Sequence, residues 1–188
     1  MRLFVGLGNP GKKYEKTRHN VGWLVLDSLA TKISNFQIPI SNQTPNNKFE
    51  FQKQFNAEVL KIGEVILAKP QTFMNDSGEA VSLLSTFYKI HPTDIYIIHD
   101  DLDIKVGEYK IQKGKGPKQH NGILSIEERL GRGDFWRVRV GIENRGSEKR
   151  IQGEVYTLQE FDESEMEQLN SVISRITNTL IKDFLVHF

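Results

Sequence analysis

Short apolar runs that end in glycine or polar residues alternate with amphipathic stretches along this chain. Leu3–Leu7 and Ile95–Ile98 are strongly apolar, and each predicts a buried strand. Each run is followed by polar residues, as expected where a strand leaves a sheet. The other predicted strands are Phe49–Leu60 and Val65–Ala68, joined near Gly63, then Gly107–Ile111, Phe135–Ile142 and an edge strand at Val155–Leu158.

Apolar residues at helical spacing predict four helices between and after these strands. Asn20 is a good N-cap for the first, Gly131 ends the third after Asn121–Leu130, and Asp162 caps the last. Residues 34–48, which include Pro39 and Pro45, are predicted to be a loop. The predicted inward faces are Val21, Leu24, Val25, Leu29 and Ile33 in the first helix, Ala80, Val81, Leu84, Phe87 and Tyr88 in the second, and Met166, Leu169, Val172, Ile173, Ile176, Leu180 and Phe184 in the last.

The alternation of strands and helices predicts an α/β fold. With no repeat and no dividing linker, residues 1–188 are expected to form a single domain: a twisted, mixed, mostly parallel β-sheet flanked by α-helices.

The chain has no cysteine, which excludes disulfides, thiolate metal sites and a cysteine nucleophile. Gly6, Gly8 and Pro10 interrupt the first apolar run, so it does not resemble a signal peptide. No apolar run approaches the ~20 residues that span a bilayer. We therefore expect a cytoplasmic protein with no membrane partner.

Charge is distributed unevenly, although the net charge is only +1. Residues 105–150 hold twelve Lys and Arg against six Asp and Glu, whereas residues 151–174 hold six acids and no base. A basic half can attract a polyanion even when the whole protein is nearly neutral. Chance clustering on a solvated surface is the alternative interpretation of the same pattern.

Polar residues follow several predicted strand ends, where α/β folds usually have their binding and active sites. The first such segment runs through a glycine-rich turn to His19, just before a helix. Histidine can act as a base near neutral pH. Phe73-Met74-Asn75, His99-Asp100-Asp101-Leu102-Asp103 and His120-Asn121-Gly122 follow later. We expect these four segments to form one site, in which Phe73 and Met74 either wall a pocket or belong to the core.

Two of these segments allow more than one interpretation. Gly6-x-Gly8-x-x-Gly11 matches a dinucleotide-binding pattern, but Lys12–Arg18 has no apolar helical face, and Asp27 falls inside a helix. A tight turn that points Asn9 into a cleft is the simpler interpretation. Residues 99–103 could bind a divalent metal or could supply one carboxylate that orients a histidine. We favour the orienting acid, because no second acidic cluster follows another strand.

The ordered set of motifs closely resembles bacterial-type peptidyl-tRNA hydrolase, over about three quarters of the chain. The resemblance implies hydrolysis of the ester that joins a peptide to the 3′ end of tRNA. We expect a monomeric esterase that uses no cofactor and no metal. The matching segments are Val5-Gly6-Leu7-Gly8-Asn9-Pro10-Gly11, Tyr14-x-x-Thr17-Arg18-His19-Asn20-Val21-Gly22, Lys69-Pro70-x-Thr72-Phe73-Met74-Asn75-x-Ser77-Gly78, His99-Asp100-Asp101-Leu102-Asp103, His120-Asn121-Gly122 and Arg137-x-Arg139-x-Gly141-Ile142.

Carried over residue by residue, the resemblance implies that His19 is the general base that activates water and that Asp100 is its orienting partner. It further implies that Asn9, Asn75 and Asn121 hold the peptide, the water and the terminal nucleotide. Tyr14 and Phe73, followed by Met74, match positions that line the binding site for the tRNA end and the peptide. Lys110 and Arg139 match basic positions that clamp a tRNA phosphate.

The chain departs from the family pattern in the loop before His120, which is usually almost all glycine. Here residues 113–119 read Lys-Gly-Lys-Gly-Pro-Lys-Gln, so lysines stand where glycines are expected and could strengthen phosphate contact. A second basic family position, linked to the tRNA 5′ phosphate, falls on Gln112, for which Lys113 could substitute. After Ile142 the usual turn is replaced by Glu143-Asn144-Arg145-Gly146.

Two other functions remain open from the sequence alone. The first is a non-catalytic RNA-binding module with the same basic half, which the presence of both His19 and Asp100 disfavours. The second is a nucleotide-dependent enzyme that uses the glycine-rich turn.

Overall fold

The computed structural model describes residues 1–35, 48–146 and 151–185, and it contains one seven-stranded sheet. The strand order is β2-β3-β4-β1-β5-β7-β6. The neighbours β4, β1, β5 and β7 run parallel, while β2, β3 and β6 pair antiparallel. The predicted α/β fold with a mixed sheet is therefore confirmed. The strands are β1 Arg2–Gly6, β2 Glu50–Gln52, β3 Ala57–Ile62, β4 Val65–Pro70, β5 Ile95–Lys105, β6 Tyr109–Lys113 and β7 Trp136–Glu143.

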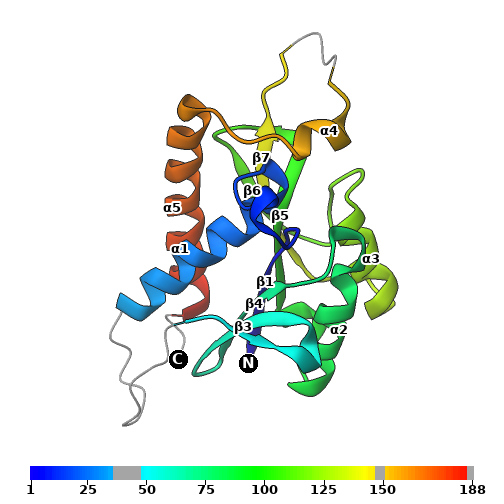
Figure 1. Cartoon of the computed structure of the whole chain (residues 1–188). Coiled ribbons are helices and arrows are strands. Elements are labelled where there is room, and N and C mark those ends of the chain that lie inside the picture. Colours follow the sequence, from blue (N-terminus) through cyan, green and yellow to red (C-terminus); the bar gives the residue numbers. More distant parts are fainter. Residues whose placement is uncertain (36–47, 147–150, 186–188) are drawn as a thin grey trace.

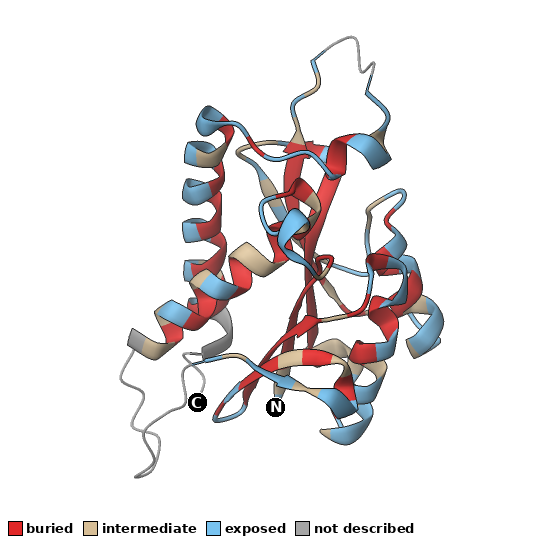
Figure 2. Cartoon of the chain, viewed as in Figure 1, coloured by how far each residue is buried: buried red, intermediate tan, exposed pale blue. Residues whose placement is uncertain are grey.

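Helices cover both faces of the sheet (Figure 1). α1 (Val21–Asn35) packs with α5 (Glu163–Leu185) on one face, and α2 (Ser77–Phe87) packs with α3 (Asn121–Leu130) on the other. Successive side chains of β1 point to opposite faces of the sheet, so Phe4 packs in the core under α1 and α5, while Leu3 and Val5 pack in the core under α2 and α3. Figure 2 shows burial concentrated in the sheet and on the inward faces of these helices. The short elements are α4 Gly153–Thr157 and the 3₁₀ turns η1 Lys12–Tyr14, η2 Arg18–Asn20, η3 Lys53–Phe55, η4 Met74–Asp76 and η5 Pro92–Asp94.

Three local predictions were wrong. The edge strand expected at Val155–Leu158 is largely the helical turn α4, which buries Tyr156 against the Arg18 guanidinium. The single strand expected at Phe49–Leu60 is broken by η3, whose left-handed C-cap, Asn56, turns the chain before β3. Phe87 is exposed at the end of α2 and does not belong to its inward face. The predicted loop at 34–48 and the side chain of Phe184 lie largely outside the described residues.

The predicted ends of two helices are confirmed. Asp162 Oδ1 accepts a hydrogen bond from the Glu165 backbone N–H at 2.8 Å, and Glu165 Oε2 accepts one from the Asp162 N–H at 2.9 Å. This reciprocal pair is a capping box at the start of α5. Gly131 ends α3 in the left-handed conformation, with φ 66°. Within the described residues, no helix combines the length and the apolar character that a membrane crossing requires.

Glycines bring α1 into direct contact with the strand ends. A Cβ at Gly22 would lie 2.4 Å from the Ile98 carbonyl oxygen and 2.5 Å from the Leu7 nitrogen, and one at Gly6 would lie 2.4 Å from the Gly22 oxygen. A Cβ at Gly8 would lie 2.8 Å from Trp23 Nε1. Gly6 and Gly8 of the apparent dinucleotide pattern thus allow α1 to pack closely, which supports the simpler interpretation of that turn. The residues that precede α1 are consequently held against the ends of β1 and β5.

We expect Gly22→Ala to lower the free energy of unfolding by about 1–3 kcal/mol, because its methyl group would meet backbone atoms that cannot move independently. Denaturant unfolding of the variant and the wild type measures this change. Ser28→Ala, a partly buried position on the same helix, is the matched control and should stay within about 0.5 kcal/mol of wild type. Equal unfolding midpoints for Gly22→Ala and wild type would contradict the close approach.

Candidate active site

The turn between β1 and α1 is locked by Asn20. This fully buried side chain accepts a hydrogen bond from the Asn9 N–H at 2.9 Å through its Oδ1 and donates to the Asn9 carbonyl at 3.0 Å through its Nδ2. α1 begins directly after Asn20, as predicted, but the side-chain amide of Asn20 is hydrogen-bonded to Asn9. The η2 turn therefore fixes both Asn9 and the neighbouring His19.

Asp100 joins two histidines through one oxygen. His19 Nδ1 lies 2.7 Å from Asp100 Oδ1, and His120 Nε2 lies 3.0 Å from the same atom. The side chain of Asp100 is 3% exposed, that of His120 is 3% exposed, and that of His19 is 15% exposed. Of the three groups, His19 is the one that reaches solvent.

The electrostatics of this cluster favour an ionised carboxylate. Burial opposes ionisation of Asp100, but His19 and His120 outweigh burial and hold the pKa of the carboxyl well below its usual range. Burial likewise works to lower the pKa of His19, yet the charge of Asp100 and its hydrogen bond outweigh burial and raise that pKa. His19 is thereby tuned as a stronger base than a free imidazole.

The hydrogen bonds determine which nitrogen of each ring carries a proton. A carboxylate can only accept, so His19 Nδ1 and His120 Nε2 are both assigned as donors to Asp100. The Nε2 of neutral His19 then carries a lone pair, and it has no hydrogen-bond partner within the described part of the chain. This nitrogen is the group in the cluster that is free to take a proton.

His120 lies in a segment predicted to reach the site, but no role was predicted for its side chain. Its Nδ1 accepts a hydrogen bond from the Ile123 N–H at 3.4 Å, so it caps α3 with one nitrogen and holds Asp100 with the other. A buried neighbour, His99, donates through Nδ1 to the Asp100 carbonyl at 2.7 Å. Burial first, and then the proximity of His120, lower the pKa of His99 to about 3. The position of His120 directly before a helix was the available sequence signal, because that is where a side chain can cap.

These groups open into a cleft of about 870 Å³. Its walls come from the β1 turn, the end of β5, η4, the start of α3 and the α4 segment on the opposite side. Segments far apart in sequence therefore meet at one place. The lining residues are Asn9, His19, Phe73, Met74, Asn75, Asp100, Leu102, Gln119, His120, Asn121, Leu124, Gln152, Gly153, Glu154, Thr157 and Leu158.

The three predicted asparagines all line this cleft, but they differ in exposure. Asn75 and Asn121 are exposed, whereas Asn9 is buried and its Oδ1 accepts the Met74 N–H at 2.8 Å. The Nδ2 of Asn9 has no partner among the described residues. Phe73 is 55% exposed at the cleft wall. Asn9 is thus oriented with its amide donors unused, beside His19.

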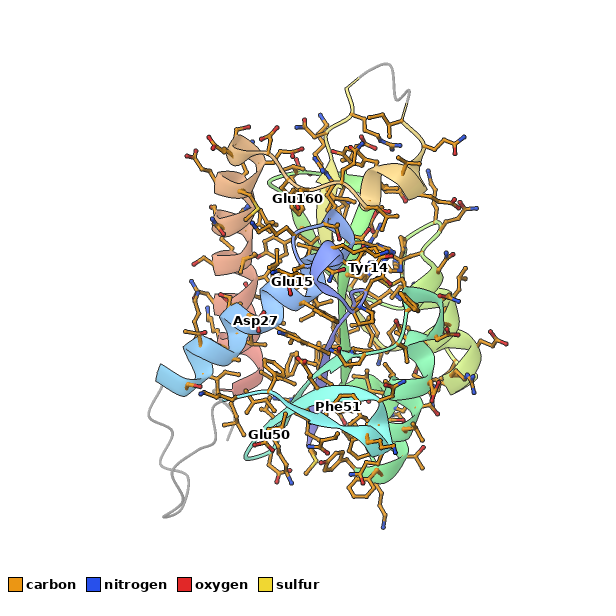
Figure 3. All side chains as sticks on the ribbon, viewed as in Figure 1. Tyr14, Glu15, Asp27, Glu50, Phe51 and Glu160 are labelled. Carbon is orange, nitrogen blue, oxygen red and sulfur yellow. The ribbon has the colours of Figure 1, made fainter. Side chains whose placement is uncertain are left out.

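Tyr14 does not line the cleft, in contrast to the other aromatic residue predicted for the site. It lies on the η1 turn, labelled near the middle of Figure 3, with the Lys13 amine 4.7 Å from its ring centroid. Tyr14 therefore lies outside the wall of the cleft.

The α4 side of the cleft is tied to the His19 turn by Arg18. Its guanidinium lies 4.2 Å from the ring centroid of Tyr156 in α4 and donates to Glu165 Oε2 at 2.5 Å. The Arg18 N–H donates to the Gln159 carbonyl at 3.0 Å, and Thr17 forms a β-bridge with Glu160. These contacts fix the position of the far wall relative to His19.

The aspartates of residues 99–103 do not converge on one point. Asp101 points to the other face of the sheet, where Oδ2 accepts from Arg139 Nε at 2.6 Å, while Asp103 Oδ1 lies 3.7 Å from Lys118 Nζ. Strand alternation predicts this separation of Asp100 and Asp101. Within the described residues, the group that could hold a metal ion is His19, Asp100 and His120, whose ligand atoms lie within 4.8 Å of one another.

Lys110 and Arg139 face each other across β6 and β7, but they are not equally accessible. Lys110 is exposed, whereas Arg139 is 8% exposed and donates to Asp101 and, through Nη1, to Gln112 Oε1 at 2.8 Å. Neither residue lines the cleft. Any ligand of this pair would lie outside the cavity.

Comparison with known proteins identifies the relatives of this chain. The family model of peptidyl-tRNA hydrolase matches residues 3–186. A peptidyl-tRNA hydrolase of Neisseria meningitidis serogroup C is 38% identical over 179 residues, which cover 93% of this chain and 86% of the relative. One from Coxiella burnetii is 41% identical over 151 residues, covering 80% and 74%. The crystal structure of peptidyl-tRNA hydrolase from Acinetobacter baumannii superposes with a TM-score of 0.80 at 30% identity, covering 100% of this chain and 91% of that one.

We expect Asp100→Asn to lower the pKa of His19. The substitution removes the charge that raises this pKa and leaves the burial that lowers it. NMR titration of the His19 ring protons in both proteins measures the change. The ring protons of His91, an exposed histidine that precedes η5, provide the internal control. An unchanged His19 pKa would mean that Asp100 does not control this ring.

Proposed function

Because this chain belongs to the peptidyl-tRNA hydrolase family and is a hydrolase of peptidyl-tRNA, we propose that His19 is its general base and Asp100 the residue that orients and stabilises that base. The observation that carries the proposal is the hydrogen bond of 2.7 Å between His19 Nδ1 and Asp100 Oδ1, which leaves Nε2 free to act at the cleft. An ester has a better leaving group than an amide, so an activated water suffices and no covalent nucleophile is needed.

The reaction starts with a water molecule hydrogen-bonded to the Nε2 of His19. As the water oxygen bonds to the ester carbon, Nε2 takes one of its protons, and the carbonyl oxygen becomes an oxyanion. The intermediate then releases the ribose 3′ oxygen, which accepts the proton from the imidazolium, so that free tRNA and the peptide acid are formed. Asp100 stabilises the imidazolium between these steps, because it is ionised and buried beside the ring.

Asn9, Asn75 and Asn121 are proposed to position the reacting groups. The unused amide donors of Asn9 lie beside His19, which suits them for the water or for the developing oxyanion. The exposed amides of Asn75 and Asn121 suit the peptide backbone and the terminal nucleotide. Phe73 and Met74 form the apolar part of the wall against the peptide, and Tyr14 contacts the tRNA end as it approaches.

Lys110 and Arg139 are proposed to bind a tRNA phosphate without taking part in the chemistry. Lys110 is exposed and available. Arg139 can bind a phosphate only if it gives up its hydrogen bond to Gln112 or to Asp101. We propose a monomer as the working unit. We further propose that the protein acts in the cytoplasm, where peptidyl-tRNA arises during translation.

We expect His19→Ala to lower kcat by about 10²-fold or more, which is roughly 2.7 kcal/mol of barrier at ~1.36 kcal/mol per tenfold. The assay uses an N-blocked aminoacyl ester of adenosine, in excess EDTA, after the fold has been checked by circular dichroism. His91→Ala is the control and should keep wild-type activity. Near-normal kcat in folded His19→Ala would remove this residue from the mechanism. If wild type loses its activity in EDTA and Mg²⁺ or Mn²⁺ restores it, the His19–Asp100–His120 cluster binds a metal ion that the reaction requires.

We expect Lys110→Ala to weaken binding of intact peptidyl-tRNA at low salt and to flatten the slope of log K against log[salt] by about 0.7–0.9. Its turnover of the adenosine ester should equal that of wild type, because that substrate has no phosphate. Adding Arg139→Ala should weaken tRNA binding further and also lower stability, since Asp101 would be left buried without its partner. A loss in Lys110→Ala that is equally large on the adenosine ester would contradict the phosphate assignment.

A further inference from the structure

The segment from the end of β6 to the start of α3 carries exposed positive charge beside the cleft. Residues 113–119 include three lysines, Lys113, Lys115 and Lys118, and no acid. All three are exposed. Among the described residues, Asp103 forms an ion pair with this group, 3.7 Å from Lys118 Nζ, and the side chains of Asp103 and Lys118 are 37% and 88% exposed. An ion pair so exposed is worth little, so the charge of Lys118 remains available to a ligand.

Two arginines of β7 hold this loop in place. Arg137 Nη1 donates to the Gly116 carbonyl, and its Nη2 donates to Glu127 and to the Gly133 carbonyl. The Arg139 guanidinium packs directly on Gly116, where an added Cβ would lie 2.3 Å from its Cζ. Asp101 in turn holds Arg139. Both arginines are buried and paired with carboxylates, so they shape the loop while its lysines stay free.

The loop leads directly into the reacting centre. Its last residue, Gln119, lines the cleft, and the next two residues are His120 and Asn121. In peptidyl-tRNA the ester lies on the 3′-terminal nucleotide, so the phosphates that precede it in the chain are only one or two nucleotides from the scissile bond. A basic segment that is held in place and ends at the cleft is suited to contact those phosphates.

We propose that Lys115 and Lys118 bind the phosphates of the single-stranded 3′ end of tRNA. The proposal rests on the proposed function, since that function places the 3′ end in the cleft, and it assigns the two lysines a role separate from that of Lys110 on β6. Arg137, which donates to the Gly116 carbonyl, acts as a positioning residue for this loop. Phosphate contacts of this kind are independent of base identity and sensitive to salt.

The test compares Lys115→Gln/Lys118→Gln with Lys53→Gln/Lys182→Gln, a control pair of exposed lysines on η3 and α5. Binding of a fluorescent single-stranded RNA ending in CCA is measured by anisotropy at several salt concentrations. We expect the loop variant to flatten the log K against log[salt] slope by about 1.4, or about 0.7 per lost single-strand contact, and the control pair to leave it unchanged. Lys115→Arg/Lys118→Arg should restore wild-type binding. A slope equal to that of the control pair would overturn the proposal.

Turnover separates this proposal from the function on which it rests. Three N-blocked aminoacyl esters are compared: of adenosine, of a CCA trinucleotide and of intact tRNA. We expect the loop variant to match wild type on adenosine and to lose kcat/KM on both the trinucleotide and tRNA. Equal loss on all three would mean that the lysines shape the active site, and loss on tRNA alone would place their contacts on the duplex; either result overturns the proposal. If wild type hydrolyses none of the esters, the proposed function fails, and RNA binding alone decides the role of the lysines.

Discussion

One carboxylate oxygen of Asp100 accepts hydrogen bonds from two histidines, and the site depends on this arrangement. The shared oxygen fixes the protonated nitrogen of each ring and leaves a lone pair on His19 Nε2 at the cleft. His120 has its second nitrogen bonded to the start of α3, so the carboxylate is anchored from the helix side. The pKa of Asp100 is depressed because its two partners outweigh the effect of burial. Without both histidines, the buried charge of the Asp100 carboxylate would destabilise the folded protein.

The fold delivers His19 to that carboxylate through tight backbone packing. Gly22 brings α1 against the Leu7 and Ile98 backbone, and Asn20 ties the preceding turn to Asn9. Arg18, the residue before His19, is bound to Glu165 and stacks on Tyr156 of α4. The segment Arg18–Asn20 therefore fixes the position of His19 relative to β5, to Asn9 and to the opposite wall of the cleft. Small changes in this packing would move the base relative to its substrate.

Much of this architecture follows from patterns that act locally. The apolar runs predicted the buried central strands, the Asp162 and Gly131 signals located helix ends, and strand alternation separated Asp100 from Asp101. Long-range contacts could not be predicted in the same way. Tyr156 lies in a helical turn, stacked on Arg18, although the residues around it look like strand residues. His120 enters the site from a helix-cap position. The guanidinium of Arg139 is paired with the carboxylate of Asp101, a residue on another strand. In each case the deciding partner is distant in sequence.

The pH dependence of kcat/KM on the N-blocked aminoacyl ester of adenosine tests the central claim most directly, because this substrate requires the base but no tRNA contact. If neutral His19 is the base, held by Asp100, the rate rises with pH through an apparent pKa above the ordinary histidine value, and that pKa equals the one obtained by NMR titration of the His19 ring. A profile that is flat through the titration of His19, or that follows a different pKa, would contradict the claim.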